Sequence, residues 1–421
     1  MQTDRPVELT GPKGLPPEPP TDLAVIGDRD VRLFDAGYHW PSAVIIEPNL
    51  RRNSAIMAAY CDRHGVSLAP HGKTTMAPDL FDIQLRDGAW AITAATVWQA
   101  RVMRAAGVPR VLIANEVVTD AEVTWLAGTL DDPTFEVSCY VDSLASVEIL
   151  DRVLSSGART RRLPVLVELG VPDGRTGART IEEALDVAAA ARRTSTLQVL
   201  GTSAFEGIIT ATAGRTIDER VQDLLADLHR LTQEIAASGG FDDTPEVVVS
   251  AGGSAFFDHV VAEFASLDVG RPVRPVLRSG NYLIHADGGY EHTSPMGGDP
   301  RLPPDEGRLA AAMEVWGAVL SRPEPTRAIV GVGRRDVSPD GDPPVVRSVR
   351  SQRGDPQDVV ATTVALNDQH AYLEVPADAP IAVGDLVAFG VGHGCTTFDK
   401  WRAITMVDHD YTIQRIVRTY F

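Results

Sequence analysis

The chain has 421 residues, of which 44% are hydrophobic and 23% charged, so a single small core is excluded and two globular domains are expected. Its formal net charge of -18 at pH 7 argues against nucleic acid or an anionic membrane surface as partner, because both would repel the chain. Three widely spaced cysteines, Cys61, Cys139 and Cys395, suggest no disulfide framework. We therefore expect a soluble cytoplasmic protein that acts on a small molecule.

Residues 1–41 are expected to form an N-terminal arm followed by a strand that joins a later β-domain. The start of the chain has no apolar run of the kind that a signal peptide needs, and four prolines between residues 16 and 20 indicate an extended segment. The β-rich run Val31–Asp35 is the strand that we expect to join the β-domain. No apolar run in the sequence is long enough to cross a bilayer.

Residues 42–287 alternate short β-rich runs with helical runs, which is the rhythm of a parallel sheet with crossover helices. We predict an α/β fold in which this region is a (β/α)8 barrel. A closed barrel needs eight strands, so the first of nine candidates is assigned to a flanking position. The nine candidates are Ala43–Ile46, Val66–Ala69, Ala91–Ala94, Val111–Ala114, Glu136–Val141, Val165–Leu169, Val199–Thr202, Val247–Ser250 and Val276–Arg278. The predicted helices are Asn49–Arg63, Val97–Ala106, Ser143–Leu154, Ile181–Arg193, Thr216–Ala237 and Ala255–Ala265.

Residues 288–421 lack crossover helices and are predicted to form a C-terminal all-β domain. Alternating or β-branched runs are separated there by Gly, Pro and Asp. The predicted strands are Trp316–Leu320, Arg327–Val332, Val345–Val349, Val359–Leu366, His370–Val375, Leu386–Phe389, Ala403–Val407 and Ile413–Thr419.

Lys73 lies where the first barrel strand is expected to end, in the run Pro70-His71-Gly72-Lys73-Thr74. The carboxyl end of a barrel strand is where catalytic residues gather. Desolvation at such a place lowers the pKa of a lysine and suits it for a Schiff base, although a solvated lysine in a loop is the commoner occurrence.

Two glycine-rich turns follow the last two predicted strands, where barrels commonly hold phosphate. Glycine lets backbone N–H groups approach an anion closely, but one such turn alone is a weak signal. The candidate residues of the first turn are Ser250, Gly252, Gly253 and Ser254, and those of the second are Arg278, Gly280, Asn281 and Tyr282.

Two further charged residues also follow barrel strands and are expected at the same end. Arg175 lies in the turn Gly174-Arg175-Thr176-Gly177, and Glu206 lies in Phe205-Glu206-Gly207. A salt bridge within a loop is an equally good explanation for each.

His393 and Cys395 form a possible metal pair in the C-terminal region. If the segment is extended, both side chains point to the same side and can reach one ion. Imidazole with thiolate favours zinc, and two protein ligands leave room for water and substrate. A bare His-x-Cys is nevertheless more often accidental, since structural zinc sites use four ligands.

Taken together, these motifs resemble those of fold-type III, alanine-racemase-like pyridoxal-phosphate enzymes, in the D-serine dehydratase and D-threonine aldolase branch. The run from Pro70 to Thr74 is similar to the family's cofactor-lysine motif, and Arg175-Thr176-Gly177 is similar to its Arg-x-Gly turn. The run from His393 to Trp401 is similar to the metal motif of the dehydratases over nine positions.

The resemblance implies pyridoxal 5'-phosphate on Lys73, a divalent metal, zinc or else manganese, on His393 and Cys395, and a homodimer in which one β-domain covers the other barrel. It also implies cofactor contacts from the turns above and from His71 and Phe205. The freed amine of Lys73 would take the Cα proton, and the metal would act on the leaving β-hydroxyl. A D-3-hydroxyamino acid of the D-serine, D-threonine or D-threo-3-hydroxyaspartate type would yield a 2-oxo acid and ammonia.

Two departures and three alternatives accompany this expectation. Gly394 stands where the best-known dehydratases have proline, and Arg278 is racemase-like because an arginine beside the pyridine nitrogen weakens the electron sink. An aldolase would release glycine and an aldehyde, and would have aspartate in place of Cys395. A racemase would need no metal and a second base, while a non-enzymatic cofactor-binding barrel would lack the second domain.

Overall fold

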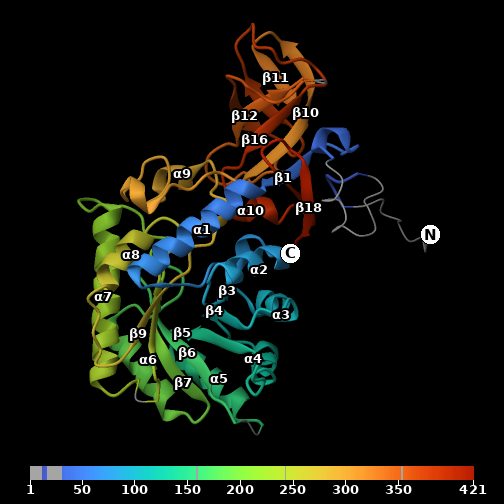
Figure 1. Cartoon of the computed structure of the whole chain (residues 1–421). Helices are drawn as coiled ribbons and strands as arrows, with labels where there is room; N and C mark the ends of the chain where they lie inside the picture. The colour runs from blue at the N-terminus through green and yellow to red at the C-terminus, as the bar shows by residue number, and fades with distance from the viewer. Residues whose placement is uncertain (1–11, 17–30, 158–159, 242, 352–353) are drawn as a thin grey trace, which may run out of the picture.

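The computed structural model describes residues 12–16, 31–157, 160–241, 243–351 and 354–421. Two sheets organise these residues, one of eight parallel strands and one of ten strands. In Figure 1 the ten-stranded sheet stands on one end of the eight-stranded sheet and its helices. Within the described ranges, no helix has both the length and the hydropathy that crossing a membrane requires.

The eight-stranded sheet is the predicted barrel. Its strand order is β2-β9-β8-β7-β6-β5-β4-β3, with every ladder parallel. The two ends of this order, β2 and β3, are joined just beyond β2. A bridge between His71 and Thr93 and a hydrogen bond from the Thr93 N–H to the Pro70 carbonyl (2.9 Å) close the barrel there. The strands are β2 (Ser67–Leu68), β3 (Ile92–Ala94), β4 (Arg110–Glu116), β5 (Glu136–Val141), β6 (Leu163–Leu169), β7 (Leu197–Ala204), β8 (Val247–Ala251) and β9 (Val273–Leu277).

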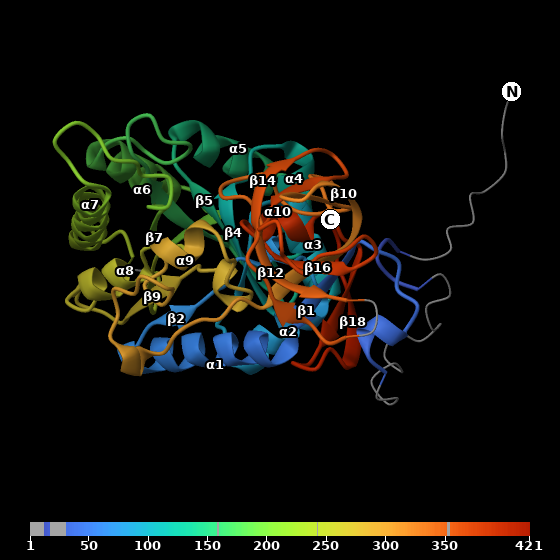
Figure 2. The same cartoon turned by 90° about the horizontal axis from the view of Figure 1, so that it is seen from above.

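Helices surround this sheet, as the view from above shows (Figure 2). Their beginnings are encoded locally: the side chains of Ser143 and Thr216 accept hydrogen bonds from backbone N–H groups in the first turns of α5 and α7, and both helices carry capping boxes. The helices are α1 (Glu47–His64), α2 (Pro78–Arg86), α3 (Val97–Ala105), α4 (Asp120–Ala127), α5 (Leu144–Leu154), α6 (Ile181–Arg193), α7 (Ile217–Ala237) and α8 (Phe257–Phe264).

The ten-stranded sheet forms the predicted β-domain. Its main path is β13-β12-β16-β10-β1-β17-β18, and β11, β15 and β14 extend it from β10. Strand β1 (Ser42–Ile46) lies outside the barrel, as expected, because it pairs with β10 on one side and β17 on the other. The other strands are β10 (Met313–Glu324), β11 (Arg327–Val330), β12 (Val345–Arg350), β13 (Gln357–Asp358), β14 (Thr362–Leu366), β15 (Ala371–Glu374), β16 (Leu386–Gly390), β17 (Ala403–Val407) and β18 (Ile413–Arg418).

The predicted strand Val31–Asp35 is wrong in detail. Arg32 makes a single bridge to Thr412, and Leu33–Asp35 form the 3-10 turn η2. Leu33 is fully buried against the β-domain core. The apolar residues of this segment therefore pack against the β-domain without forming a paired strand. The boundaries expected near residues 41 and 287 stay a prediction. Of the four N-terminal prolines, Pro17, Pro19 and Pro20 lie outside the described residues.

Candidate active site

Lys73 lies in the 3-10 turn η3 (Gly72–Thr74), directly after β2 at the carboxyl end of the barrel. The side chain is half-buried, and burial lowers the pKa of Lys73 below its usual value. Cys395 opposes this shift of the pKa, while Arg175 and Arg278 add to it. The turn is tightly packed, because a Cβ on Gly72 would lie 2.6 Å from Ile92. A lysine with a lowered pKa is suited to nucleophilic attack on a carbonyl.

His71 precedes this turn and lies under the same influences. Its Nδ1 is buried and has no hydrogen-bond partner among the described residues. Burial, followed by the positive charges of Lys73 and Arg278, lowers the pKa of His71 well below its usual value. The ring is therefore neutral at physiological pH and offers one unpaired nitrogen.

The first glycine-rich turn meets a carboxylate of the chain itself. The backbone N–H groups of Gly252 and Gly253 both donate to the buried side chain of Glu206, at 3.2 Å for Gly252. Gly252 has a φ of +89°, a left-handed conformation that favours glycine. The predicted phosphate amides thus do bind an anion, but Glu206 supplies it, and a phosphate would have to lie beside that carboxylate or displace it.

The second glycine-rich turn brings Asn281 to the mouth of the barrel. Asn281 is 3% exposed, and neither atom of its side-chain amide has a partner among the described residues. Its backbone N–H donates to the Ser254 hydroxyl (3.3 Å). Gly280 lies close to the Lys73 turn, since a Cβ there would be 2.8 Å from the His71 carbonyl and 2.9 Å from Thr74. A buried amide without partners points to a ligand that supplies them.

Arg278 and Ser250 lie in the barrel interior below this mouth. Arg278 is 4% exposed and donates to the Ser250 hydroxyl and to the Ala204 carbonyl, each at 2.6 Å. Its guanidinium lies 5.9 Å from the centre of the Tyr140 ring. Ser250 therefore holds Arg278 in place, and its own hydroxyl donates to the Val276 carbonyl (3.1 Å).

Arg175 and Phe205 meet at the mouth, with the guanidinium 4.3 Å from the ring centre. A residue that sequence reasoning missed, Arg179, holds the loop that carries Arg175. The Arg179 guanidinium donates to four successive carbonyls, those of residues 174 to 177, at 2.7 to 3.1 Å. A Cβ on Gly170 would collide with this guanidinium, so glycine is required there.

His393 and Cys395 lie on the β-domain side of the same mouth. The Cys395 thiol contacts the Thr74 hydroxyl (3.2 Å), one residue from Lys73. Burial raises the pKa of Cys395, while Thr74 and Lys73 act to lower it. The expected extended segment is wrong: Gly394 is helical and Cys395–Phe398 form the short helix α10. The argument from alternate side chains of a strand therefore does not apply.

The contact between Cys395 and Thr74 also bears on the expected homodimer. The resemblance implies that the β-domain of one subunit covers the barrel of the other, but α10 packs against η3 within one chain. Figure 1 shows α10 at the junction of the two sheets. A homodimer remains a proposal that this contact does not require.

Gly394 has a packing explanation. A Cβ at this position would collide with Cδ1 of the buried Ile284, and would lie 3.1 Å from Asn281 Oδ1. The backbone of Gly394 has a φ of −64°, which any residue adopts, so space and not conformation selects glycine. Glycine at this position lets the loop pack closely onto Ile284.

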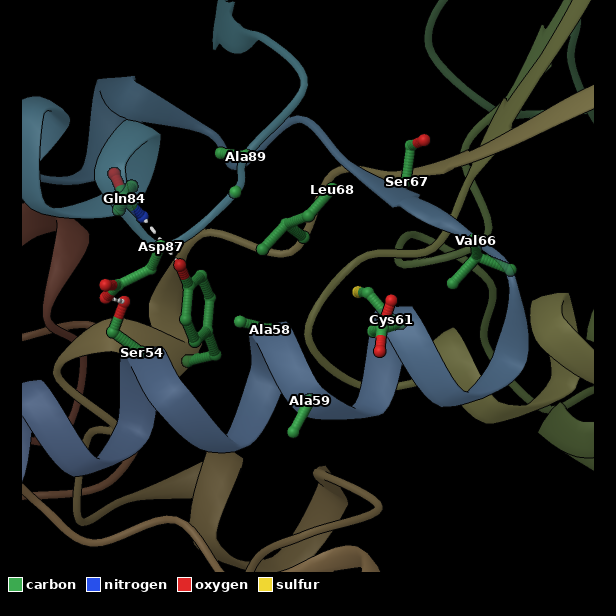
Figure 3. A pocket seen from close by; sticks show the side chains of 13 residues that line it. Ser54, Ala58, Ala59, Cys61, Val66, Ser67, Leu68, Gln84, Asp87 and Ala89 are labelled. Atoms are coloured by element: carbon green, nitrogen blue, oxygen red, sulfur yellow. Dashed lines mark hydrogen bonds between the residues drawn. The ribbon is translucent and has the colours of Figure 1, made fainter.

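The structure does not bring Tyr282 to the site. Its hydroxyl accepts a hydrogen bond from Gln84 (3.1 Å), and its side chain lines a cavity of about 440 Å³ between α1, β2 and the end of α2. Figure 3 shows this cavity with Ser54, Cys61 and Asp87 around it. Its walls come from the flank of the barrel, so this cavity is separate from the mouth.

Two carboxyl groups that sequence reasoning also missed face each other inside the barrel. Glu116 ends β4 and Glu168 lies in β6; both Glu116 oxygens and one Glu168 oxygen are buried without a donor among the described residues. Burial, followed by the charges of Glu168 and Asp142, raises the pKa of Glu116 to about 8. The only sequence signal was one acidic residue in each of two strands, and only the strand of Glu168 is otherwise apolar.

Several solved structures are similar to this chain in fold. A solved alanine-racemase-like protein from Idiomarina loihiensis superposes with a TM-score of 0.68 at 15% identity, over 90% of this chain and 96% of that chain. A D-threonine aldolase from Filomicrobium marinum gives a TM-score of 0.76 at 23% identity, over 94% and 98%. A D-threo-3-hydroxyaspartate dehydratase from Delftia sp. HT23 gives 0.69 at 21% identity, over 91% and 98%. The fold is therefore alanine-racemase-like, a parallel barrel with a C-terminal β-domain, as predicted.

Sequence similarity points to a smaller group of proteins within this fold. The family model of the putative serine dehydratase domain matches residues 312–407, which include His393 and Cys395. A D-threonine aldolase from Arthrobacter sp. is 29% identical over 380 residues, 87% of this chain and 88% of the relative. A 3-hydroxy-D-aspartate aldolase from Paracoccus denitrificans is 25% identical over 356 residues, 84% of each chain. The chain is thus related to lyases of the D-threonine aldolase and serine dehydratase group, and the expected resemblance is confirmed.

Proposed function

We propose that the protein is a lyase that acts on a D-3-hydroxyamino acid with pyridoxal 5'-phosphate held by Lys73 and a divalent metal held by His393 and Cys395. Dehydration to a 2-oxo acid and ammonia is the reaction that we favour. The observation that supports this proposal best is the contact between the Cys395 thiol and the Thr74 hydroxyl, because Thr74 adjoins Lys73 and Cys395 is one of the two proposed metal ligands.

The residues at the mouth fit the cofactor. The lowered pKa of Lys73 favours the neutral amine that must bind an aldehyde. The unpaired amide of Asn281 and the unpaired Nδ1 of His71 are buried groups that a polar ligand would satisfy. Arg175 adds a cation at the edge of the same mouth, against Phe205. Ser254, Gly280 and the amides paired with Glu206 would lie nearest its phosphate.

The donor set of His393 and Cys395 also fits a divalent metal with open positions. One neutral imidazole and one thiol suit zinc, with manganese as the alternative, and burial lowers the pKa of His393 so that its ring is free to bind. Among the described residues no cluster of three or more His, Cys, Asp or Glu side chains forms a closed metal site. A two-ligand pair leaves positions for water and for a substrate hydroxyl, which the catalytic role requires.

When bound, the cofactor would acidify the substrate Cα–H and the metal would assist departure of the β-hydroxyl. The chain's own contribution is positional. The amine of Lys73 takes and holds the Cα proton on the side of the substrate that a D-amino acid presents to it. Because the Thr74 hydroxyl contacts the Cys395 thiol, Lys73 and the proposed metal pair would act on neighbouring parts of the substrate.

Aldol cleavage is the second candidate, because both curated relatives reported above are aldolases. Cleavage of Cα–Cβ would require a base for the β-hydroxyl proton and would release glycine and an aldehyde. Cys395 is the residue that favours dehydration, since the resemblance associates thiolate with the dehydratases and aspartate with the aldolases.

One experiment separates the two reactions. D-Serine, D-threonine and D-threo-3-hydroxyaspartate, with their L-isomers, are incubated with purified protein, and ammonia, 2-oxo acid and glycine are measured before and after chelation and metal return. We expect ammonia from D-isomers only, and its loss on chelation. Glycine without ammonia would select the aldolase, while enantiomer formation that survives chelation would select a racemase.

A further inference from the structure

Residues 12–16, a described part of the N-terminal arm, pack against the end of the run that carries the proposed metal pair. Leu15 is 3% exposed and belongs to a hydrophobic cluster of the β-domain. The Ser42 hydroxyl, at the start of β1, donates to the Gly14 carbonyl (2.7 Å). Gly14 lies so close to Trp401 that a Cβ on it would be 2.8 Å from the indole ring. The arm is therefore anchored to the β-domain at these residues.

Lys13 is the charged residue of this segment, and its ammonium group makes three contacts with the β-domain. It lies 3.8 Å from the centre of the Trp401 ring. It donates to the Arg335 carbonyl (2.9 Å) and to Asp336 Oδ1 (3.1 Å). Asp336 is 2% exposed, so Lys13 compensates the charge of a buried carboxylate. One lysine thus joins the arm, the loop at residues 335–336 and the last residue of the metal motif.

Hydrogen bonds continue from this loop to the backbone of the metal pair. The indole N–H of Trp401 donates to the Asp336 carbonyl (2.9 Å). Two residues later, the Ser338 backbone N–H donates to the Thr397 hydroxyl (3.0 Å). That hydroxyl donates to the His393 carbonyl (2.9 Å). The loop that Lys13 contacts therefore holds both ends of the run from His393 to Trp401.

We propose that Lys13 is a positioning residue of the metal site: by holding the loop of residues 335–338 in place, it fixes the backbone that carries His393 and Cys395. The inference rests on the proposed function, because it concerns the two metal ligands named there. Two protein ligands bind one ion well only if their separation is fixed, and residues beyond the ligands commonly supply that rigidity. Loss of Lys13 would leave the buried Asp336 carboxylate without its cation, which favours a displaced loop.

The test measures zinc affinity of metal-stripped, cofactor-loaded protein by competition with a chromogenic chelator. Lys13→Met is expected to bind zinc about tenfold more weakly than the wild type, the loss that removal of an outer-shell partner causes. Lys13→Arg keeps the charge and can still lie over the indole, so it should restore most of the affinity. Arg335→Met is the matched control, because it removes an exposed cation from the same loop but keeps the carbonyl that Lys13 uses. Its zinc affinity should equal that of the wild type.

Thermal unfolding and the amount of cofactor fixed by borohydride are recorded for each variant. A purely structural role of Lys13 would lower the melting temperature but leave the zinc affinity of the folded protein unchanged. The proposal predicts that zinc affinity falls while the amount of fixed cofactor stays at the wild-type level. If Lys13→Met does not fold, Lys13→Gln takes its place, because it keeps a neutral donor for Asp336, and a smaller loss of zinc affinity is then expected.

The possible failures of the inference and of the proposed function differ. Zinc affinity in the folded Lys13 variants equal to that of the wild type, or an equal loss in Arg335→Met, would overturn the inference and leave the proposed function intact. Zinc binding that stays at the wild-type level when His393 and Cys395 are both replaced by alanine would overturn the proposed metal site, and the inference with it.

Discussion

The two halves of the barrel interior deal with buried charge in opposite ways. On the side of β7 to β9, Arg278 finds acceptors in Ser250 and Ala204, so the cation is held by preformed hydrogen bonds. On the side of β4 to β6, Glu116 and Glu168 have buried oxygens without donors. A buried charge needs either partners or the neutral form. The first half therefore keeps its cation by hydrogen bonds, whereas in the second half burial raises the pKa of Glu116 and favours its neutral form.

Lys73 follows β2, which pairs with β9 at the edge of the cationic half, and its replacement removes the reactive group there. Lys73→Ala is expected to lower turnover by about a thousandfold or more, because both the covalent attachment and the acceptor of the Cα proton are lost. Borohydride reduction followed by peptide mass spectrometry should find the cofactor on Lys73 in the wild type. Lys73→Arg, which keeps the charge but cannot form the attachment, should be equally inactive. A reduced adduct that persists in Lys73→Ala would assign the cofactor to another residue.

The close packing of the β-domain loop onto this half can be tested at Gly394. Gly394→Ala is expected to destabilise the protein by about 1–3 kcal/mol, because the added methyl group collides with Cδ1 of Ile284 in a filled core. Ile284→Val removes that Cδ1, so the double variant should recover most of the loss. The measurement is urea unfolding of the four proteins of the cycle. Additive losses would show that the two side chains do not share the space.

Arg179 holds the loop that follows β6, in the half of the barrel that contains Glu116 and Glu168. Arg179→Gln removes most of the bonds to the carbonyls of residues 174 to 177, and Arg175 should then lose its fixed position over Phe205. We expect cofactor affinity to fall about tenfold, since mobile loops add an ordering cost to binding. Titration of the cofactor-free protein by fluorescence measures this. Arg192→Gln on α6 is the control, and an unchanged affinity in Arg179→Gln would remove Arg179 from the site.

How far the sequence predicts this site depends on how local each signal is. Lys73 and the glycine turns follow strand ends, and strand ends are visible in the hydrophobic pattern. The conformation at Cys395 was mispredicted because a single helical turn after Gly394 has no periodicity to recognise. Glu206 filling the Gly252 turn and Tyr282 facing the flank depend on tertiary packing, which no local pattern contains. Arg179 was missed because its function lies in bonds to backbone carbonyls, which carry no sequence identity.

The smallest expected effect concerns the proton on the acidic half. The pKa of Glu116 is raised from its ordinary 4.5 to about 8, so the folded protein binds this proton more tightly than the unfolded chain does. The stability that it contributes is complete below about pH 4.5 and is lost as the pH rises through about 8. Glu116→Gln keeps a neutral side chain at every pH, so its melting temperature should decline less between about pH 5 and pH 8.5 than that of the wild type. Glu182→Gln, an exposed residue on α6, should follow the wild-type curve. Parallel curves for wild type and Glu116→Gln would mean that Glu116 is ionised throughout, and the two halves of the barrel would then not differ in the way described.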